Sequence, residues 1–317
     1  MIATAPRTDL FAADVRHYLT RSPRQLPSRY LYDDLGSALF EAICRLPWYP
    51  LTRAEMRLIA ANARRILDRR VTSIVELGGG SGVKMSALIR GAGSGRGPLD
   101  VHVVDVSGTA LAETQRTLGA LDDLRVVTHE TTYESGLEAL RSAPPARGTR
   151  LMLFLGSNLG NFDSDGRDLF LSRLRESLRA GDRLLLGVDL VKPVRDLLLA
   201  YDDPLGVTAA FNLNLLARVN AELSASFALD RFAHHVVWDE ERSRIEMHLR
   251  SKAAQRVRIP GAGLDLAFRE GETIWTESSY KYETGGIVDM LERAGFGVIA
   301  QWADAVDRFA LTLAEAM

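Results

Sequence analysis

The chain has 317 residues, a formal net charge of −2 and 46% hydrophobic residues. This length can build one large domain or two smaller ones with a full hydrophobic core, and the near-neutral charge gives no general attraction to nucleic acid or anionic membranes. The single cysteine, Cys44, excludes an internal disulfide and a thiolate metal cluster. The amino-terminal residues lack the apolar stretch of a signal peptide, and no run has the length of a membrane span, so we expect a cytoplasmic protein.

The first 70 residues predict helices joined by proline-containing breaks. We expect helices over residues 10–19, 38–45 and 53–69, with a linker over 22–28. Thr52 and Glu55 have the spacing of a capping box, so Thr52 is expected to cap the third helix. The apolar side chains of that helix are Met56, Ile59, Ala60 and Ile66.

Residues 72–84, TSIVELGGGSGVK, predict a strand, a glycine turn and a helix. Glycine has no Cβ, so the turn can be tight, can take positive φ and can let a ligand approach the backbone. A second strand over 101–104 ends in Asp105, an acid placed to hold the hydroxyls of a ribose. The glycines Gly78, Gly80 and Gly82 follow the acid Glu76, a pattern that favours S-adenosylmethionine (SAM), which has no pyrophosphate, over a dinucleotide.

Short apolar strands then alternate with helices, which predicts a parallel, doubly wound sheet with the ligand at the carboxyl ends of its strands. The expected strands cover 74–77, 101–104, 124–128, 151–155 and 182–188, and the expected helices cover 109–118, 137–140 and 165–177.

The alternation of short apolar strands with helices ends after Asp189. Helices are expected over 194–201 and 209–226, a hairpin over 232–238 and 244–250, and further strands over 257–259 and 267–269. A helix over 287–294 and strands over 297–299 and 309–313 then close the chain. We therefore predict a core domain of residues 60–195 and 284–317, and a second, α+β domain of residues 1–59 and 196–283.

With these motifs in view, the chain resembles the histidine Nα-methyltransferases of ergothioneine biosynthesis, which convert histidine to its betaine, hercynine. The resemblance runs over nearly the whole chain and includes strings without counterparts in general methyltransferases. These strings are YDDLGSALFEAI, LPWYPLTRAE, VELGGGSGVK, FLGSNLGN, LLLGVDLVK, AYDDPLGVTAAFNLNLL, RIEMHLR and TESSYKY.

The resemblance implies a class I SAM-dependent methyltransferase with a Rossmann-like, doubly wound sheet and a family-specific substrate domain. By motif matching, the cofactor positions are Gly78, Gly80, Lys84, Asp105, Thr132 and Tyr133. The substrate positions are Tyr49, Asn161, Tyr201, Glu277 and Ser279. In the family, the asparagine and the tyrosine of the AYDD string hold the substrate carboxylate, and the other three address the imidazole. Tyr32 matches a family tyrosine close to the substrate amine and is our catalytic candidate.

Thr132 departs from the family pattern, in which an acid near the adenine amino group precedes the aromatic residue. A threonine hydroxyl can accept the same N–H without charge, so a weaker bond is expected. Glu130 is an alternative acceptor.

The chemistry of these residues supports the assignment. Lys84 is expected in the first turn of its helix, where a cation is unfavourable unless an anion is near, and the carboxylate of SAM would be such an anion. A carboxylate at Glu277 can accept an imidazole N–H, and in an extended strand Ser279 points to the same side. The alternatives without a functional role are an exposed lysine at position 84 and a solvated strand surface at 277–279. Asn158 is a rival to Asn161.

The six histidines show no metal-ligand spacing, so we expect no metal. We expect a monomer that acts on a small molecule and binds neither nucleic acid nor membrane. Two alternatives remain open: a methyltransferase of the same fold acting on another amino acid or a modified histidine, and a cofactor-binding module without catalysis.

Overall fold

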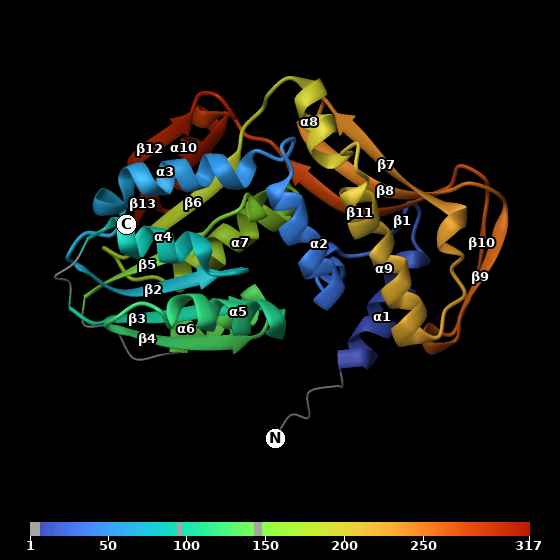
Figure 1. The fold of residues 1–317 in the computed structure, drawn as a ribbon, viewed down its shortest axis with the longest axis horizontal. Helices are drawn as coiled ribbons and strands as arrows, with labels where there is room; N and C mark the ends of the chain where they lie inside the picture. The colour runs from blue at the N-terminus through green and yellow to red at the C-terminus, as the bar shows by residue number, and fades with distance from the viewer. Residues whose placement is uncertain (1–6, 94–96, 143–147) are drawn as a thin grey trace. The chain divides into compact units, whose positions relative to one another are not determined.

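The computed structural model describes residues 7–93, 97–142 and 148–317. The chain forms two compact units (Figure 1). Unit 1 consists of Met1–Tyr49 and Pro193–Ser279, and unit 2 consists of Pro50–Lys192 and Tyr280–Met317. The chain first passes from unit 1 to unit 2 before helix α3 (Leu51–Ile66). The boundary predicted from the sequence instead lies within that helix.

Unit 2 is built on a seven-stranded sheet of order β12-β13-β6-β5-β2-β3-β4. The five strands from β6 to β4 are parallel, and β13 joins β6 and β12 in antiparallel pairs. The strand order reverses beside β2, so a ligand is expected at the carboxyl ends of β2 and β5. The strands are β2 (Val71–Leu77), β3 (Leu99–Asp105), β4 (Leu124–Glu130), β5 (Thr149–Phe154), β6 (Arg183–Asp189), β12 (Phe296–Asp304) and β13 (Phe309–Ala316). The predicted parallel, doubly wound sheet is confirmed.

Helices cover both faces of this sheet. All seven residues of β6 are buried, as expected for a strand enclosed on both sides. One core cluster joins Val75 and Met152 of the sheet to Phe170 and Ile287 on two helices. The remaining helices of unit 2 are α4 (Val83–Gly91), α5 (Gly108–Leu118), α6 (Tyr133–Ser142), α7 (Ser164–Glu176) and α10 (Thr284–Arg293).

The capping box predicted for α3 is wrong. The helix begins at Leu51, its N-cap is Pro50, and no side chain among the described residues caps it. Its buried stripe also differs from the predicted one, because Ala60 is exposed and Glu55 is buried. The residues facing the core are Leu51, Ala54, Glu55, Leu58, Ile59, Ala63 and Ile66. The helix can turn Glu55 inward because the carboxylate finds polar partners inside unit 2, which are described below.

Unit 1 contains a four-stranded sheet of order β1-β11-β8-β7 and a separate β10-β9 pair. The predicted hairpin is confirmed as the antiparallel pair β7–β8. The two-residue strand β1, which pairs in parallel with β11, was missed inside the predicted linker. The strands are β1 (Arg24–Gln25), β7 (Phe232–Asp239), β8 (Arg244–Ser251), β9 (Gln255–Ile259), β10 (Leu264–Phe268) and β11 (Thr273–Tyr280). The helices are α1 (Arg7–Leu19), α2 (Asp34–Arg45), α8 (Val194–Tyr201) and α9 (Val207–Leu223).

Two lysines and an aspartate mark the places where the chain leaves unit 2 and returns to it. Asp189, at the end of β6, is fully buried, and its Oδ1 lies 2.6 Å from Lys192 Nζ. Its Oδ2 lies 2.9 Å from Nζ of Lys281, whose side chain is also fully buried. Backbone bonds join the same segments, because Tyr282 N–H donates to the Asp189 carbonyl at 3.1 Å. The outgoing and returning segments are therefore tied together within unit 2.

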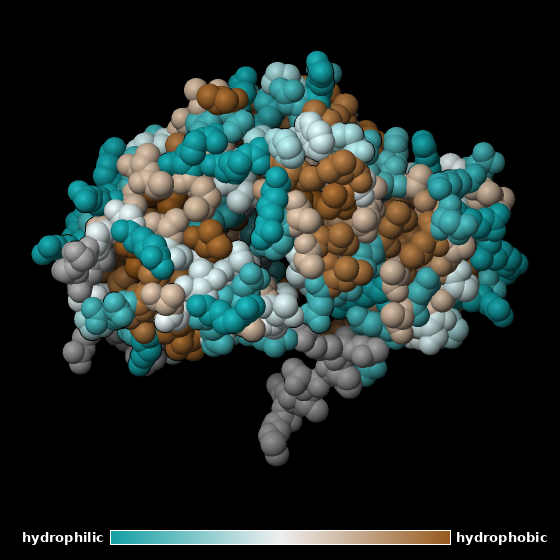
Figure 2. Space-filling model, viewed as in Figure 1, coloured by the Kyte–Doolittle hydropathy of each residue, from teal (hydrophilic) through white to brown (hydrophobic). Residues whose placement is uncertain are grey.

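Hydrophilic and hydrophobic residues are interspersed on the face shown in Figure 2. Single large hydrophobic residues are exposed in both units; Val306 and Leu205, for example, are 87% and 70% exposed. Isolated residues of this kind are normal on a protein surface. No helix in the described parts of the chain combines the length and the apolar character needed to cross a bilayer.

Replacing Asp189 by asparagine should remove the charge that two buried lysines share. Removing one partner of a buried ion pair costs about 3–5 kcal/mol of unfolding free energy. Urea denaturation of Asp189→Asn measures the loss. As a control, Asp168→Asn removes an acid that is 57% exposed and pairs with Arg167, and should cost about 1 kcal/mol or less. Equal unfolding midpoints for Asp189→Asn and the unmutated protein would contradict the assigned role.

Candidate active site

The glycine turn after β2 adopts the left-handed backbone conformation that its sequence predicts. Gly78, Gly80 and Gly82 have φ values of 76°, 54° and 71°. Gly82 is the N-cap of α4, whose first residue is Val83. A Cβ on Gly78 would lie 2.5 Å from Tyr133 Oη, so this position combines a positive φ with a close approach.

Asp105 supports this turn from the end of β3. Its Oδ2 accepts the N–H of Gly80 at 3.4 Å, and its Oδ1 accepts the N–H of Ser107 at 2.9 Å. Burial raises the pKa of Asp105, and these backbone N–H groups oppose that shift. The acid predicted to hold a ribose therefore lies beside the glycine turn.

Glu76, the acid that precedes the glycines, is 1% exposed. Its Oε2 has no hydrogen-bond partner among the residues that the structure describes, and it would lie 3.4 Å from a Cβ on Gly79. Burial raises the pKa of Glu76 to about 8; the Lys84 charge opposes this shift, and the charges of Glu55 and Asp105 add to it. The turn therefore covers a carboxyl group that is poorly stabilised as an anion.

Lys84, in the first turn of α4, has an anionic partner within the protein. Its Nζ lies 2.6 Å from Oε2 of Glu55, the inward-facing acid of α3. Both oxygens of Glu55 also accept the N–H of Gly156, at 2.9 and 3.0 Å. The alternative of an exposed lysine at this position is wrong, because the Lys84 side chain is only 25% exposed.

The turn after β5 brings its asparagines to the same edge of the sheet. Ser157 has a φ of 62°, and a short 3-10 helix, Asn158–Asn161, follows it. A Cβ on Gly78 would lie 2.9 Å from the side-chain nitrogen of Asn158. Asn158 is therefore next to the glycine turn, whereas Asn161 ends the 3-10 helix and is half-buried.

Thr132 and Tyr133 lie at the start of α6. The Thr132 hydroxyl oxygen accepts the N–H of Ser135 at 3.4 Å, and the side chain is exposed. The Tyr133 ring makes an edge contact with Phe154 at 5.5 Å, and burial raises the pKa of its hydroxyl. Tyr133 is thus placed against the glycine turn, while Thr132 has a local role at the start of the helix.

The residues at this edge of the sheet fit SAM. A Cβ on Gly80 would meet no described heavy atom within 4 Å, so the backbone there is open to a ligand. Three carboxyl groups, Glu55, Glu76 and Asp105, surround the turn with one lysine, and Glu76 has a buried oxygen without a partner in the described part of the chain. An excess of acid suits a cofactor that carries a sulfonium and an ammonium. Lys84 would suit its carboxylate.

Four of the predicted substrate residues form a second group, in unit 1. The Tyr201 hydroxyl donates to Ser279 Oγ at 2.7 Å, and both side chains are buried. The rings of Tyr49 and Tyr201 make an edge contact at 6.1 Å. Burial raises the pKa of Tyr49 well above its ordinary value, and the neighbouring Tyr201 and Glu277 add to this shift, so its hydroxyl remains a hydrogen-bond donor.

Tyr32 belongs to an aromatic cluster in the same unit. Its ring makes edge contacts at 5.5 Å with both Phe40 and Phe211. Phe40 in turn contacts the ring of Tyr49 at 6.3 Å. The catalytic candidate is therefore linked by packing to the tyrosines of the substrate group.

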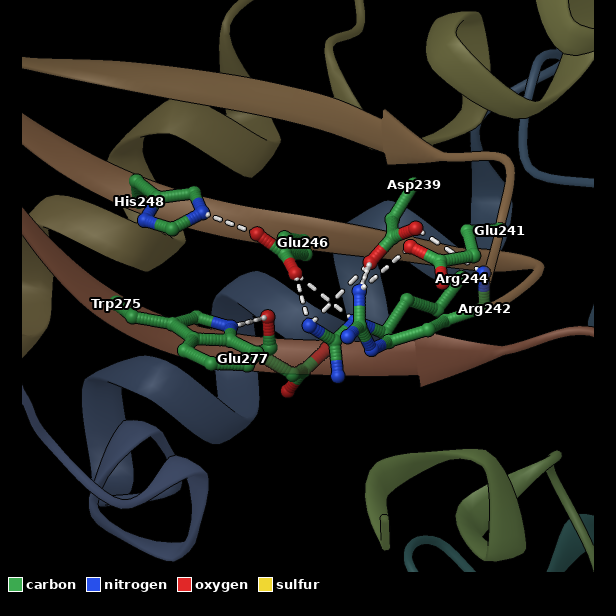
Figure 3. Close-up of polar contacts among 8 residues, drawn as sticks. All are labelled: Asp239, Glu241, Arg242, Arg244, Glu246, His248, Trp275 and Glu277. Atoms are coloured by element: carbon green, nitrogen blue, oxygen red, sulfur yellow. Dashed lines mark hydrogen bonds and ion pairs between the residues drawn. The ribbon is translucent and has the colours of Figure 1, made fainter. Parts of the chain in front are cut away.

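Strand β11 carries Trp275, Glu277 and Ser279 at alternate positions, which confirms the extended conformation expected there. Figure 3 shows Trp275 and Glu277 beside Arg244, Glu246 and His248 of β8. The Trp275 indole N–H donates to the Glu277 carbonyl at 3.0 Å, and the Arg244 guanidinium lies 4.6 Å from the Trp275 ring centroid. These contacts fix the backbone at Glu277.

Glu246 joins two of these side chains. One carboxylate oxygen pairs with Arg244, and the other lies 2.9 Å from His248 Nε2. Burial lowers the pKa of His248 in spite of Glu246, so the neutral imidazole donates from Nε2. The His248 ring stacks on Trp275 at 5.9 Å (Figure 3).

The structure brings the predicted residues together in two groups. Unit 2 holds the six cofactor candidates and Asn161, and unit 1 holds Tyr32 and the other four substrate candidates. Within the described ranges no cluster of three His, Cys, Asp or Glu residues could hold a metal ion.

Sequence reasoning missed His234 and the role of Glu55. His234 Nε2 donates to the Tyr201 carbonyl at 2.8 Å, and its Nδ1 accepts from Asn212 Nδ2 at 2.9 Å, so it anchors the end of α8. Glu55 could have been found by its spacing, because Leu58, Ile59 and Ile66 lie on the same helical stripe.

Comparison with known proteins points to one family. The family profile described as "Histidine-specific methyltransferase, SAM-dependent" matches residues 11–316. The chain is 38% identical over 315 residues to the histidine N-alpha-methyltransferase of Mycolicibacterium smegmatis, covering 99% of this chain and 97% of that protein. It is 40% identical over 307 residues to the protein of the same name from Mycobacterium tuberculosis, covering 95% and 93%. Similarity to ergothioneine biosynthesis protein 1 of Neurospora crassa is 27% over 285 residues, covering 88% of this chain and 32% of that protein.

Glu76 predicts a pH dependence of stability. Its pKa is about 8 in the folded protein and 4.5 ordinarily, so its contribution to stability is complete below pH 4.5 and is lost as the pH rises to about 8. Within this window the difference in unfolding free energy between the unmutated protein and Glu76→Gln should change by up to about 1.4 kcal/mol per pH unit. Urea denaturation of both proteins from pH 5 to pH 9 measures it. A constant difference would show that Glu76 ionises normally.

Proposed function

Because this chain belongs to the family of histidine-specific, SAM-dependent methyltransferases, we propose that it methylates the α-amine of histidine three times to give hercynine, a step of ergothioneine biosynthesis. The observation that carries the proposal is the family match from residue 11 to residue 316, which includes both groups of candidate residues. SAM would supply a sulfonium methyl group, whose carbon the amine lone pair would attack in line while the carbon–sulfur bond breaks and S-adenosylhomocysteine leaves.

We assign imidazole recognition to Tyr49, Glu277 and Ser279. The Ser279 hydroxyl can donate to an imidazole nitrogen. The Glu277 carboxylate can accept the N–H of the other nitrogen, and together the two contacts select one neutral tautomer. The raised pKa of Tyr49 keeps its hydroxyl protonated as a further donor.

Asn161 and Tyr201 are proposed to hold the substrate carboxylate. An amide N–H and a tyrosine hydroxyl are neutral donors, and two of them can bind a carboxylate without a cation. For Tyr201, this requires the hydroxyl to turn from Ser279 to the substrate. Tyr32 is proposed to orient the amine or to pass its proton to water, since only the neutral amine has the lone pair that attacks. Orientation of that lone pair is the main source of acceleration available to these side chains.

The role of unit 1 as the substrate domain and of unit 2 as the cofactor domain is part of this proposal. So are the monomeric state and the cytoplasmic location. The single cysteine supports the location, because the chain needs no oxidising compartment for a disulfide. Size-exclusion chromatography with light scattering tests the monomer.

Mass spectrometry of a reaction with SAM and an equimolar mixture of the common amino acids tests the function. We expect a gain of three methyl groups on histidine alone. Methylation of another amino acid in place of histidine would overturn the substrate assignment. Absence of any methylated product, with SAM bound in calorimetry, would favour a modified substrate or a non-catalytic module.

Replacing Glu277 by glutamine should raise the KM for histidine far more than the KM for SAM. A hydrogen bond to a charged group contributes about 1.5–3 kcal/mol, so we expect about a 10- to 100-fold rise for histidine. Glu240, exposed in the β7–β8 turn, offers the control Glu240→Gln, which should change neither constant. Equal rises in both constants for Glu277→Gln would contradict an imidazole contact.

A further inference from the structure

Glu55 is a fully buried acid whose carboxylate contacts three separate elements of unit 2. Lys84 Nζ on α4 lies 2.6 Å from its Oε2. The N–H of Gly156, in the turn after β5, donates to both oxygens. The third contact is with β6 at Gly187.

Gly187 makes room for this carboxylate. A Cβ at position 187 would lie 2.0 Å from Glu55 Oε1, so a side chain on β6 would displace the acid. The Gly187 carbonyl also accepts the N–H of Ser157 at 3.1 Å, which ties β6 to the turn after β5. The carboxylate therefore occupies a space to which β6 contributes backbone at Gly187 and no side chain.

The charges of Glu55 and Lys84 depend on each other. A buried carboxylate without a counter-charge is strongly unfavourable, and Lys84 provides that charge. A lysine in the first turn of α4 is itself unfavourable because it meets the positive end of the helix, and Glu55 offsets this effect. The ion pair also orders a long, flexible side chain before any ligand arrives.

We propose that Glu55 is a positioning residue for the cofactor, acting through Lys84. It holds the lysine ammonium at the edge of the glycine turn, so that the carboxylate of SAM meets a cation already in place. Binding then loses less side-chain entropy than it would with a mobile lysine. The proposal rests on the proposed function, in which Lys84 binds the cofactor carboxylate.

Two ligands separate this role from a general loss of structure. S-Adenosylhomocysteine has the amino-acid carboxylate and ammonium of the cofactor, whereas 5′-methylthioadenosine has the same adenosine and sulfur without either group. The Lys84 variant described below assigns the loss to the carboxylate. In calorimetry, Glu55→Gln, which keeps an oxygen for Gly156 N–H but removes the charge, should bind S-adenosylhomocysteine about tenfold more weakly, or about 1.4 kcal/mol. Its affinity for methylthioadenosine should stay within about twofold of the unmutated protein.

A double-mutant cycle tests whether Glu55 acts through Lys84. Lys84→Met should show the same selective loss for S-adenosylhomocysteine, and adding Glu55→Gln to it should cause less than about a twofold further loss. Glu55→Asp, which keeps the charge but shortens the side chain by one methylene, is a second variant in case Glu55→Gln does not fold. This variant should lower the affinity for S-adenosylhomocysteine and leave the affinity for methylthioadenosine unchanged.

Asp182 provides a matched control. It is 6% exposed and accepts the N–H groups of Arg150 and Arg179 at 2.8 and 3.0 Å, so Asp182→Asn also removes a buried charge from unit 2. This variant should bind both ligands as the unmutated protein does. Unchanged S-adenosylhomocysteine affinity in folded Glu55→Gln, or equal losses for both ligands, would overturn the proposal. Failure of the unmutated protein to bind either ligand would instead contradict the proposed function.

Discussion

The ion pairs of Asp189 hold together the place in the seven-stranded sheet of unit 2 where the chain leaves to form a second unit. Strand β6 lies between β5 and β13, so both of its hydrogen-bonding edges are occupied. The chain must leave at its carboxyl end and return without disturbing either neighbour. Lys192 on the outgoing segment and Lys281 on the returning segment bind the two oxygens of one carboxylate, and the bridge between Leu190 and Tyr282 keeps these segments in parallel. The residues between them are free to form a unit with its own core.

The two units differ in the chemistry they offer. The candidate cofactor residues of unit 2 offer the backbone of a glycine turn together with the charged side chains of Asp105 and Lys84. The candidate substrate residues of unit 1 are mostly hydroxyls in an aromatic setting, with Glu277 as the charged exception. A cationic cofactor and a zwitterionic amino acid with an aromatic ring make these different demands.

Much of the fold followed from local patterns in the sequence. The apolar strands of unit 2 could be predicted because a strand buried on both faces is a continuous run of apolar residues. The β7–β8 hairpin could be predicted because burial on one face makes apolar and polar residues alternate. Strand β1 could not, because its two residues are extended only through pairing with β11. Glu55 was assigned to a capping box because the local spacing fits one, whereas its actual partners, Lys84 and Gly156, come from distant parts of the chain. The motif residues were named from the family resemblance; the hydrogen bond between Tyr201 and Ser279 was visible only in three dimensions.

The pairing of β1 with β11 has a consequence for biosynthesis. Arg24 pairs with Ile274, so the amino-terminal segment emerges from the ribosome long before its partner strand exists. The sheet of unit 2 also remains incomplete until β13, near the end of the chain, pairs with β6. Neither unit can finish folding during most of translation, and one hydrogen-bonding edge of the apolar strand β6 stays unpaired in that period. A cell that produces this protein must therefore protect a nearly full-length nascent chain from aggregation before either unit closes.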